Sequence, residues 1–88
     1  MKLMNKHQMG VHTPKGGWKP RTWYLVEGCV NTLNPVHTCV LYTGFLNSKG
    51  NPGSYSGITS EKYLGNGDMS IRKYKYIKVI KILHEVDL

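Results

Sequence analysis

The residues best suited to chemistry lie near the C-terminus, in the segment 70–83. This segment carries five of the twelve Lys and Arg residues of the chain, and two tyrosines stand among them. Cationic side chains neutralise phosphate groups and release counterions, and flat aromatic rings stack on unpaired bases. The segment therefore predicts binding of RNA or single-stranded nucleic acid by the residues Arg72, Lys73, Tyr74, Lys75 and Lys78.

A second basic and aromatic group lies in the segment 15–21, which reads Lys-Gly-Gly-Trp-Lys-Pro-Arg. Trp18, Lys19 and Arg21 are its predicted binding residues, because an indole ring stacks on an unpaired base of any sequence. The alternative is that Trp18 is a core residue that closes one end of the domain. The two interpretations differ in the exposure that they predict for the indole ring.

The segment 47–57 is rich in Gly, Asn and Ser and predicts a loop. Consecutive backbone N–H groups in such a loop can face a phosphate. The Gly-Lys-Ser/Thr ending of a nucleotide-binding P-loop is absent, so a plain connecting loop is the favoured interpretation. Lys49 and Tyr55 are the side chains with which this loop would bind a ligand.

The sequence contains only weak evidence for a metal site. Cys29, His37 and Cys39 converge in the predicted hairpin described below, and His7 or His12 could add a fourth ligand for zinc. No Cys-x-x-Cys pair is present, however, and two small thiols suit packing equally well. We therefore expect free cysteines, no metal and no cofactor.

Acid–base chemistry has an equally sparse signal, because the five carboxylates are scattered and no nucleophile motif is present. A metal-independent ribonuclease needs only a few His, Lys, Arg or Tyr side chains to move a proton and stabilise the phosphate. His84 with Lys81 or Tyr74 is the candidate set. The sequence predicts a binding protein rather than an enzyme, and ribonuclease activity is the remaining enzymatic alternative.

The composition favours a β fold. Alanine, the best helix former, is absent, whereas Val, Ile and Tyr, which suit pleated sheets, are plentiful. We predict a mainly β, single-domain protein, either a twisted antiparallel sheet or an SH3-like or OB-like barrel of about five strands, with room for one short helix. Residues 1–22 are predicted to form a basic, partly flexible N-terminal arm, and residues 23–88 a small β-rich domain.

A hairpin is predicted from two strand-length segments, 23–31 and 37–46. If its turn is centred on Asn34, which precedes a proline, Trp23 faces Phe45 and the two cysteines face each other. This register is a hypothesis about which side chains share a face.

The segment 70–83 follows a turn at 65–68, which reads Gly-Asn-Gly-Asp, and is predicted to be a bent strand rather than a helix. Its apolar residues change parity near Tyr76, and a bulge there would restore a common face. Tyr74 and the early lysines would then face outward, while the following apolar residues would enter the core.

The net charge of +7 favours an anionic partner. Nucleic acid is the first expectation, for instance in a phage-type accessory protein. The alternative is a protein-interaction module, an inhibitor or assembly factor, that docks on an acidic partner or adds an edge strand to another sheet. No apolar run approaches the roughly 20 residues of a membrane span, and the N-terminus lacks a signal-peptide core, so we expect a cytoplasmic protein without a membrane partner.

Overall fold

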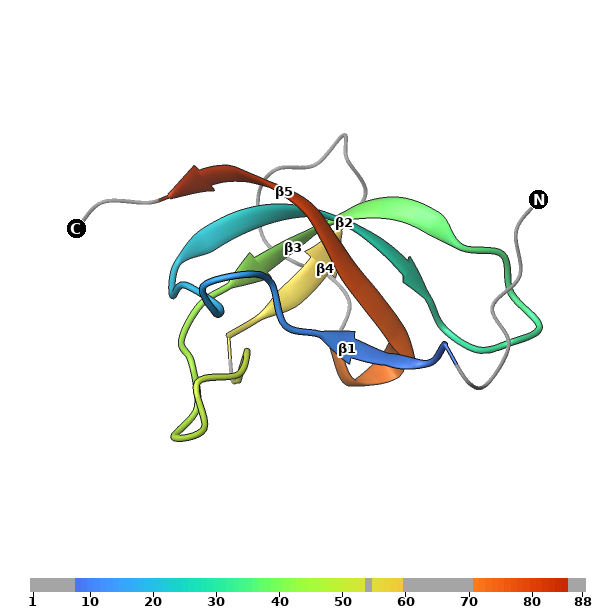
Figure 1. The fold of residues 1–88 in the computed structure, drawn as a ribbon, viewed down its shortest axis with the longest axis horizontal. Helices are drawn as coiled ribbons and strands as arrows, with labels where there is room; N and C mark the ends of the chain where they lie inside the picture. The colour runs from blue at the N-terminus through green and yellow to red at the C-terminus, as the bar shows by residue number, and fades with distance from the viewer. Residues whose placement is uncertain (1–7, 54, 60–70, 86–88) are drawn as a thin grey trace.

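A computed structural model describes residues 8–53, 55–59 and 71–85 and has the mainly β fold that the sequence predicts. The described strands form one five-stranded sheet in the order β1-β5-β2-β3-β4 (Figure 1). The elements are β1 (Gly10–His12), β2 (Thr22–Cys29), β3 (His37–Thr43), β4 (Gly57–Thr59), a 3-10 turn η1 (Ile71–Lys73) and β5 (Tyr76–Glu85). The sheet is mixed rather than purely antiparallel, because β1 pairs parallel with β5.

The described part of the predicted arm, residues 8–22, contributes strand β1 to the sheet and Trp18 to the core. β1 lies along the start of β5, and the Gly10 N–H donates a hydrogen bond of 2.7 Å to the Lys75 carbonyl. Trp18 is a core residue. A strand of three residues has too few positions to show a period, which explains why the sequence pattern missed β1. The first seven residues lie outside the described part.

β2 and β3 form the predicted hairpin, but in another register. Trp23 pairs with Tyr42 rather than with residue 45. The observed register therefore differs from the predicted one by an odd number of residues, so different side chains of the two strands share a face. The turn forms around Asn31. Its side-chain oxygen accepts the backbone N–H two residues further on at 2.8 Å, and its carbonyl accepts the Asn34 N–H at 3.0 Å. An asparagine side chain that bonds its own backbone in this way favours a turn, so Asn31 fixes the register.

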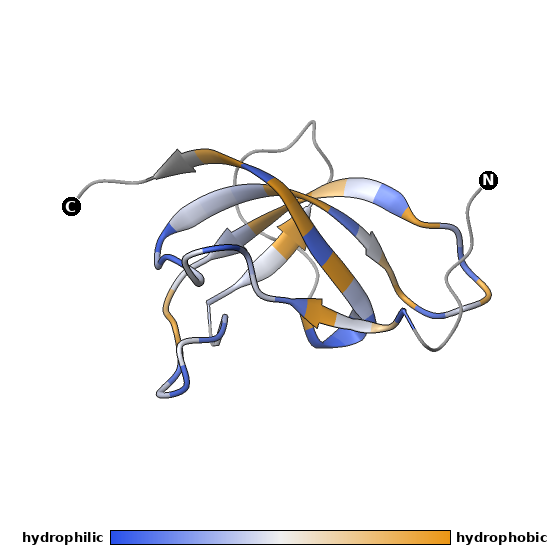
Figure 2. Ribbon diagram, viewed as in Figure 1, coloured by the Kyte–Doolittle hydropathy of each residue, from blue (hydrophilic) through white to orange (hydrophobic). Residues whose placement is uncertain are grey.

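β5 is the later part of the predicted strand 70–83. Residues 71–73 form η1 instead, and the irregularities of β5 lie later than Tyr76. The ladder between β5 and β2 shifts register twice, and each shift leaves one residue of β5 without a partner on β2, first Ile80 and then Leu83. Figure 2 shows apolar and hydrophilic bands along β5. Ile77 is buried as predicted, whereas Ile80, Ile82 and Leu83 are 51%, 45% and 37% exposed. The predicted division of this segment is therefore wrong, because Tyr74 is buried and several of the later apolar residues are exposed.

The hydrophobic core lies on one side of the sheet and holds Tyr74, although lysines flank this residue in the sequence. The ring of Tyr74 lies over Gly28, where an added Cβ would come within 2.9 Å of a ring carbon. Glycine at position 28 thus makes room for the tyrosine. The buried cluster contains Trp18, Tyr24, Val26, Cys39, Leu41, Ile58, Tyr74 and Ile77.

The loop predicted over 47–57 is observed up to the start of β4, apart from residue 54, which is not described. The predicted turn at 65–68 lies outside the described residues. The described chain contains no helix with the length and apolar character needed to cross a membrane.

Candidate nucleic-acid interface

The side of the sheet opposite the core, here called the open face, carries the side chains that alternate with the core residues. On β2, Tyr24 and Val26 are fully buried, whereas Trp23, Leu25 and Glu27 between them are half-buried. Residues paired across neighbouring strands share a face, so the register identifies the other members of the open face. By register this face holds Trp23, Leu25, Glu27, Thr38, Val40, Tyr42, Tyr76, Lys78, Lys81 and His12, of which Val40 and Tyr76 are buried, at 1% and 4% exposure.

The two bulges of β5 determine which of its lysines reach the open face. Lys78 pairs with Glu27 and Lys81 pairs with Leu25. In a regular strand, residues three positions apart point to opposite faces. Because Ile80 is an extra residue in a bulge, Lys78 and Lys81 instead point to the same face. Lys78 and Lys81 are both exposed and therefore present two ammonium groups on one face.

An aromatic pair stands at the far end of the open face. Trp23 and Tyr42 are direct cross-strand neighbours with ring centroids 4.5 Å apart and an angle of 34° between the planes. Both side chains are half-buried, so part of each ring remains in contact with solvent. An aromatic surface next to lysines is the combination that single-stranded nucleic acid uses for stacking and charge neutralisation.

A row of polar side chains crosses the open face near β1. Lys78 pairs with Glu27 on β2 and with His12 on β1, and Glu27 pairs in turn with Thr38. The Tyr76 hydroxyl donates a hydrogen bond of 2.5 Å to Glu27 Oε1. Burial of the ring, and then the hydrogen bond to the Glu27 carboxylate, raise the pKa of Tyr76 to about 12, so the phenol keeps its proton.

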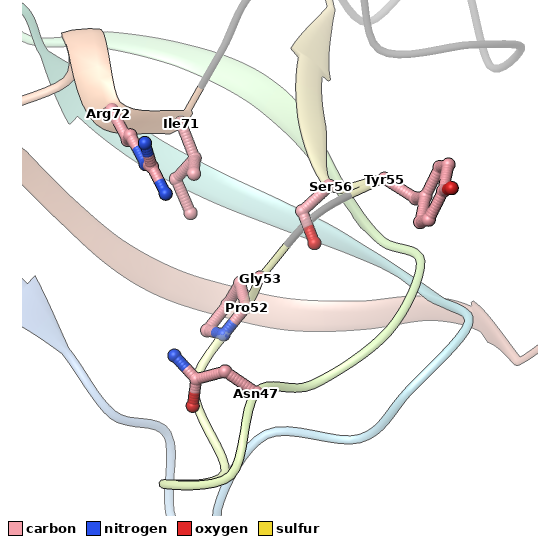
Figure 3. A pocket seen from close by; sticks show the side chains of 7 residues that line it. All are labelled: Asn47, Pro52, Gly53, Tyr55, Ser56, Ile71 and Arg72. Atoms are coloured by element: carbon pink, nitrogen blue, oxygen red, sulfur yellow. The ribbon is translucent and has the colours of Figure 1, made fainter.

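A cleft, here called the loop cleft, lies between η1 and the 47–56 loop. It has a volume of about 500 Å³ and is lined by Asn47, Pro52, Gly53, Tyr55, Ser56, Ile71 and Arg72. In Figure 3 the Arg72 side chain and the Asn47 amide flank this space, and the Tyr55 ring points away from it. The buried Ser56 Oγ makes no hydrogen bond within the described part of the chain. A second hollow, of about 390 Å³, shares Pro52, Ile71 and Arg72 with it, so Arg72 lies between two concave surfaces.

Two exposed aromatic rings stand at the rim of the loop cleft. Tyr55 is 78% exposed, Phe45 is 56% exposed, and their ring centroids are 5.6 Å apart in an edge-to-face arrangement. Tyr55 has a positive φ of 67°, which is uncommon outside glycine. It packs on Gly44, where an added Cβ would lie 2.3 Å from the Tyr55 carbonyl oxygen. The backbone contact with Gly44 therefore fixes the position of Tyr55.

The structure separates the predicted binding residues. Trp18 and Tyr74 are 6% and 8% exposed, so their rings have no free face for a base, and the core interpretation of Trp18 is confirmed. Arg72 and Lys73 are exposed on η1, and Arg72 lines the loop cleft. Lys78 stands on the open face, whereas Lys75 lines a separate hollow of about 420 Å³ beside the hairpin turn.

Lys19 and Arg21 precede β2 at the other end of the sheet. Their backbone is held by three hydrogen bonds: Lys19 N–H to the Tyr24 hydroxyl, Thr43 Oγ1 to the Lys19 carbonyl, and Arg21 N–H to the Gly44 carbonyl. Arg21 is half-buried with a φ of 48°. Because Gly44 also contacts Tyr55, these two cations lie on the side of the molecule that carries the loop-cleft rim.

Sequence reasoning missed the candidate interface residues Tyr42, Glu27 and His12. The alternation of β2 was visible in the sequence, but it identifies two faces without saying which one meets the core. His12 had no signal, because β1 itself was not predicted.

The candidate zinc ligands do not form a site in the structure. Cys29 and Cys39 are both buried and form no disulfide, and Cys39 pairs with Val26 rather than with Cys29. The Cys29 thiol donates to backbone carbonyls of the hairpin turn, at 2.7 Å to Asn31 and 3.0 Å to Asn34. Within the described ranges, no group of three His, Cys, Asp or Glu side chains is arranged to hold a metal ion.

Comparison of the chain with models of known protein families, with curated proteins and with solved structures finds no match.

Proposed function

We propose that this protein binds RNA or single-stranded nucleic acid on the open face. The observation that carries the proposal is the position of Lys78 and Lys81 on the same face as the Trp23–Tyr42 pair. The lysines neutralise phosphates of the strand, and the aromatic pair offers a surface on which bases stack. Stacking and phosphate contacts are both independent of base identity, so binding has little sequence preference.

The charge of the described surface supports an anionic partner. Glu27 is the one carboxylate whose side chain falls within the described residues, and it already accepts the Tyr76 hydrogen bond. The exposed charged side chains of the described chain are otherwise cationic: Lys15, Lys19, Lys49, Arg72, Lys73, Lys75, Lys78 and Lys81. The described surface therefore offers a phosphate backbone mainly cationic side chains.

The test is the affinity of the full chain for a fluorescent, mixed-sequence RNA strand, measured by anisotropy over a range of salt concentrations. We expect the logarithm of the affinity to fall linearly with the logarithm of salt, by about 0.7 for each phosphate neutralised. The double variant Lys78→Glu/Lys81→Glu should bind at least about tenfold more weakly, because it replaces two phosphate contacts by repulsion.

The matched control is Lys15→Glu/Lys49→Glu, which changes the net charge equally at two turns away from the open face. These turns are closed by hydrogen bonds from Gly17 to Pro14 and from Gly50 to Asn47. The control should lose much less affinity than the open-face variant. Equal losses would mean that net charge alone drives binding, and salt-independent or absent binding would contradict the proposal altogether.

A second candidate function, docking of an acidic protein, is favoured by the outer half of β5. Ile80, Ile82 and Leu83 expose apolar surface beside Lys81, and β1 covers only the first three residues of this strand. The bulges interrupt the ladder, so side-chain docking is favoured over addition of a regular strand. Capture of a protein partner from a nuclease-treated lysate, and its loss in Ile80→Asp/Ile82→Asp, would support this candidate. Loss of all captured protein after nuclease treatment would exclude it.

A further inference from the structure

We propose that the open face cleaves RNA without a metal ion, using Glu27 as general base, His12 as general acid and Lys78 to stabilise the phosphate. The inference rests on the proposed function, because the RNA strand must first lie on the open face. It uses different residues from the ribonuclease set suggested by the sequence, since Tyr74 of that set is buried.

The register places the three groups in one row. Lys78 of β5 is paired directly with Glu27 of β2 on one side and with His12 of β1 on the other. Neighbouring strands lie about 4.8 Å apart, so the Cα atoms of Glu27 and His12 are about 10 Å apart, with Lys78 between them. Base and acid therefore flank a central cation, which is the order that in-line displacement at a phosphate requires.

Tyr76 positions the base. Its hydroxyl donates to Glu27 Oε1 at 2.5 Å, while Oε2 makes no hydrogen bond to the described residues. The phenol is locked in place because Tyr76 is 4% exposed and packs with Cys29 in a second buried cluster. The carboxylate is thus held with one oxygen oriented and the other directed to a substrate hydroxyl.

His12 is suited to the role of acid because it is exposed on the edge strand. Its ring lies 5.5 Å from that of Tyr76 in an edge-to-face arrangement. Its Nε2 lies 3.4 Å from the Gln8 carbonyl oxygen, which can only accept a hydrogen bond. When the ring is charged, Nε2 donates to this carbonyl and Nδ1 carries the proton that can be transferred.

Lys78 supplies the positive charge between the acid and the base. It is exposed and makes no hydrogen bond or ion pair with the described residues, even though Glu27 stands opposite. Its ammonium group is therefore available to a phosphate oxygen. Charge placed where the phosphate gains negative charge in the transition state accelerates the reaction.

The reaction is a transphosphorylation within the RNA strand. Glu27 takes the proton of the ribose 2′-hydroxyl, and the 2′-oxygen forms a bond to phosphorus. The bond between phosphorus and the 5′-oxygen breaks, and the protonated His12 gives its proton to that oxygen. The products are a 2′,3′-cyclic phosphate and a 5′-hydroxyl, and a proton exchange with water restores both side chains. No oxidant, reductant or cofactor is required.

The decisive experiment incubates the purified full-length protein with an end-labelled RNA strand in the presence of a chelator. We expect cleavage that leaves a 2′,3′-cyclic phosphate, and no cleavage of the same strand made with 2′-O-methyl ribose, which has no proton to give. Glu27→Gln and His12→Asn should each reduce the cleavage rate about 100-fold or more, since general acid–base catalysis contributes about that much. Both variants should retain RNA affinity, whereas Lys78→Met should lower affinity and rate together.

The control variant is His37→Gln, which replaces an imidazole outside the open face. His37 bonds the Tyr74 hydroxyl at 2.9 Å and lies on the core side of the sheet. This variant should retain full cleavage activity. Tyr76→Phe should lower kcat about threefold to tenfold while KM stays unchanged, as expected of a positioning residue whose loss misorients the base.

The outcomes separate this inference from the binding proposal. RNA that is bound but remains intact in chelator would overturn the cleavage site and leave binding in place. Cleavage that persists at the wild-type rate in both Glu27→Gln and His12→Asn would also overturn it. Failure to bind the 2′-O-methyl strand, which cannot be cleaved, would contradict the proposed function itself.

Discussion

The open face and the loop cleft both combine cations with aromatic rings, but they differ in construction. The open face is built on paired strands, and its side chains are placed by the ladders of β2, β3 and β5. The loop cleft is built on turns: Asn47 Oδ1 accepts the N–H groups of Lys49 and Asn51 at 2.9 and 3.1 Å, and Arg72 comes from a 3-10 turn.

The two surfaces also differ in the chemical groups that they present to a ligand. The open face holds a carboxylate, an imidazole and a buried phenol in fixed register. Asn47, Ser56 and Arg72 of the loop cleft offer hydrogen bonds and charge, but no carboxylate or imidazole lines it. The cleavage chemistry that we propose is therefore placed on the open face, and the loop cleft is proposed as an auxiliary contact for the strand.

The largest expected effect comes from a substitution that disturbs the main chain at the rim of the loop cleft. Gly44→Ala should lower the free energy of unfolding by about 3 kcal/mol, because the new Cβ must displace the Tyr55 carbonyl, which is main chain. Urea denaturation measures the loss. Gly53→Ala is the matched control, since its Cβ would meet only ordinary contacts at 3.4 Å or more. An unfolding midpoint in Gly44→Ala equal to that of the control would contradict the tight packing.

The next effect tests the Tyr76–Glu27 bond of the open face through pH. The folded pKa of Tyr76, about 12, is higher than the ordinary value of 10.0. The protonated form is therefore favoured by folding, and this stabilisation is complete below pH 10 and lost between pH 10 and 12. Its size is about 2 to 3 kcal/mol, because each pKa unit corresponds to about 1.4 kcal/mol. The stability difference between the wild-type protein and Tyr76→Phe, measured by denaturation, should shrink across this window. A difference that is constant with pH would contradict the proposed contribution of the hydroxyl.

The third prediction compares the two surfaces by strand length. Arg72→Ala should lower the affinity for a strand of about 16 nucleotides by about tenfold, the value of one charged hydrogen bond, and should leave a strand of about 4 nucleotides unaffected. The short strand is expected to occupy the open face alone. Anisotropy titrations with both strands measure the ratio. An equal loss for both would place the primary binding site at Arg72 instead of the open face.

The smallest expected effect concerns the rim of the loop cleft. Tyr55→Ala should lower the affinity for the longer strand by about fivefold, the lower end of what a stacked base contributes, because Tyr55 is 78% exposed. Tyr55→Phe should retain the affinity, since stacking needs the ring and not the hydroxyl. If Tyr55→Ala binds as the wild type does, the loop cleft acts through Arg72 alone.

Much of the fold followed from local sequence. The aromatic and β-branched segments around β2, β3 and β5 predicted strands, and the Gly and Asn-rich stretch predicted the loop between β3 and β4. The missing alanine argued against helices, and the single described helical element is η1, three residues long. These features depend on residue type and short-range patterning, which a single sequence displays.

The candidate site could not be predicted in the same way, because its residues are brought together by register. The Asn31 turn decides that Trp23 faces Tyr42, and a shift by one residue would reverse every face of the hairpin. Trp18 and Trp23 both lie within two residues of a basic residue in the sequence, yet one packs in the core and the other on the open face. Burial of Tyr74 depends on Gly28, which is distant in sequence and close only in the fold.

The bulges of β5 have a consequence for the behaviour of concentrated solutions. Deleting Ile80 would leave Lys81 opposite Leu25 as before, since the ladder would simply become regular there. The outer half of β5 would then be a straighter, uncovered edge that offers evenly spaced N–H and carbonyl groups to another molecule, and such edges promote aggregation. Ile80, although apolar and 51% exposed, therefore helps to keep separate copies of the protein apart.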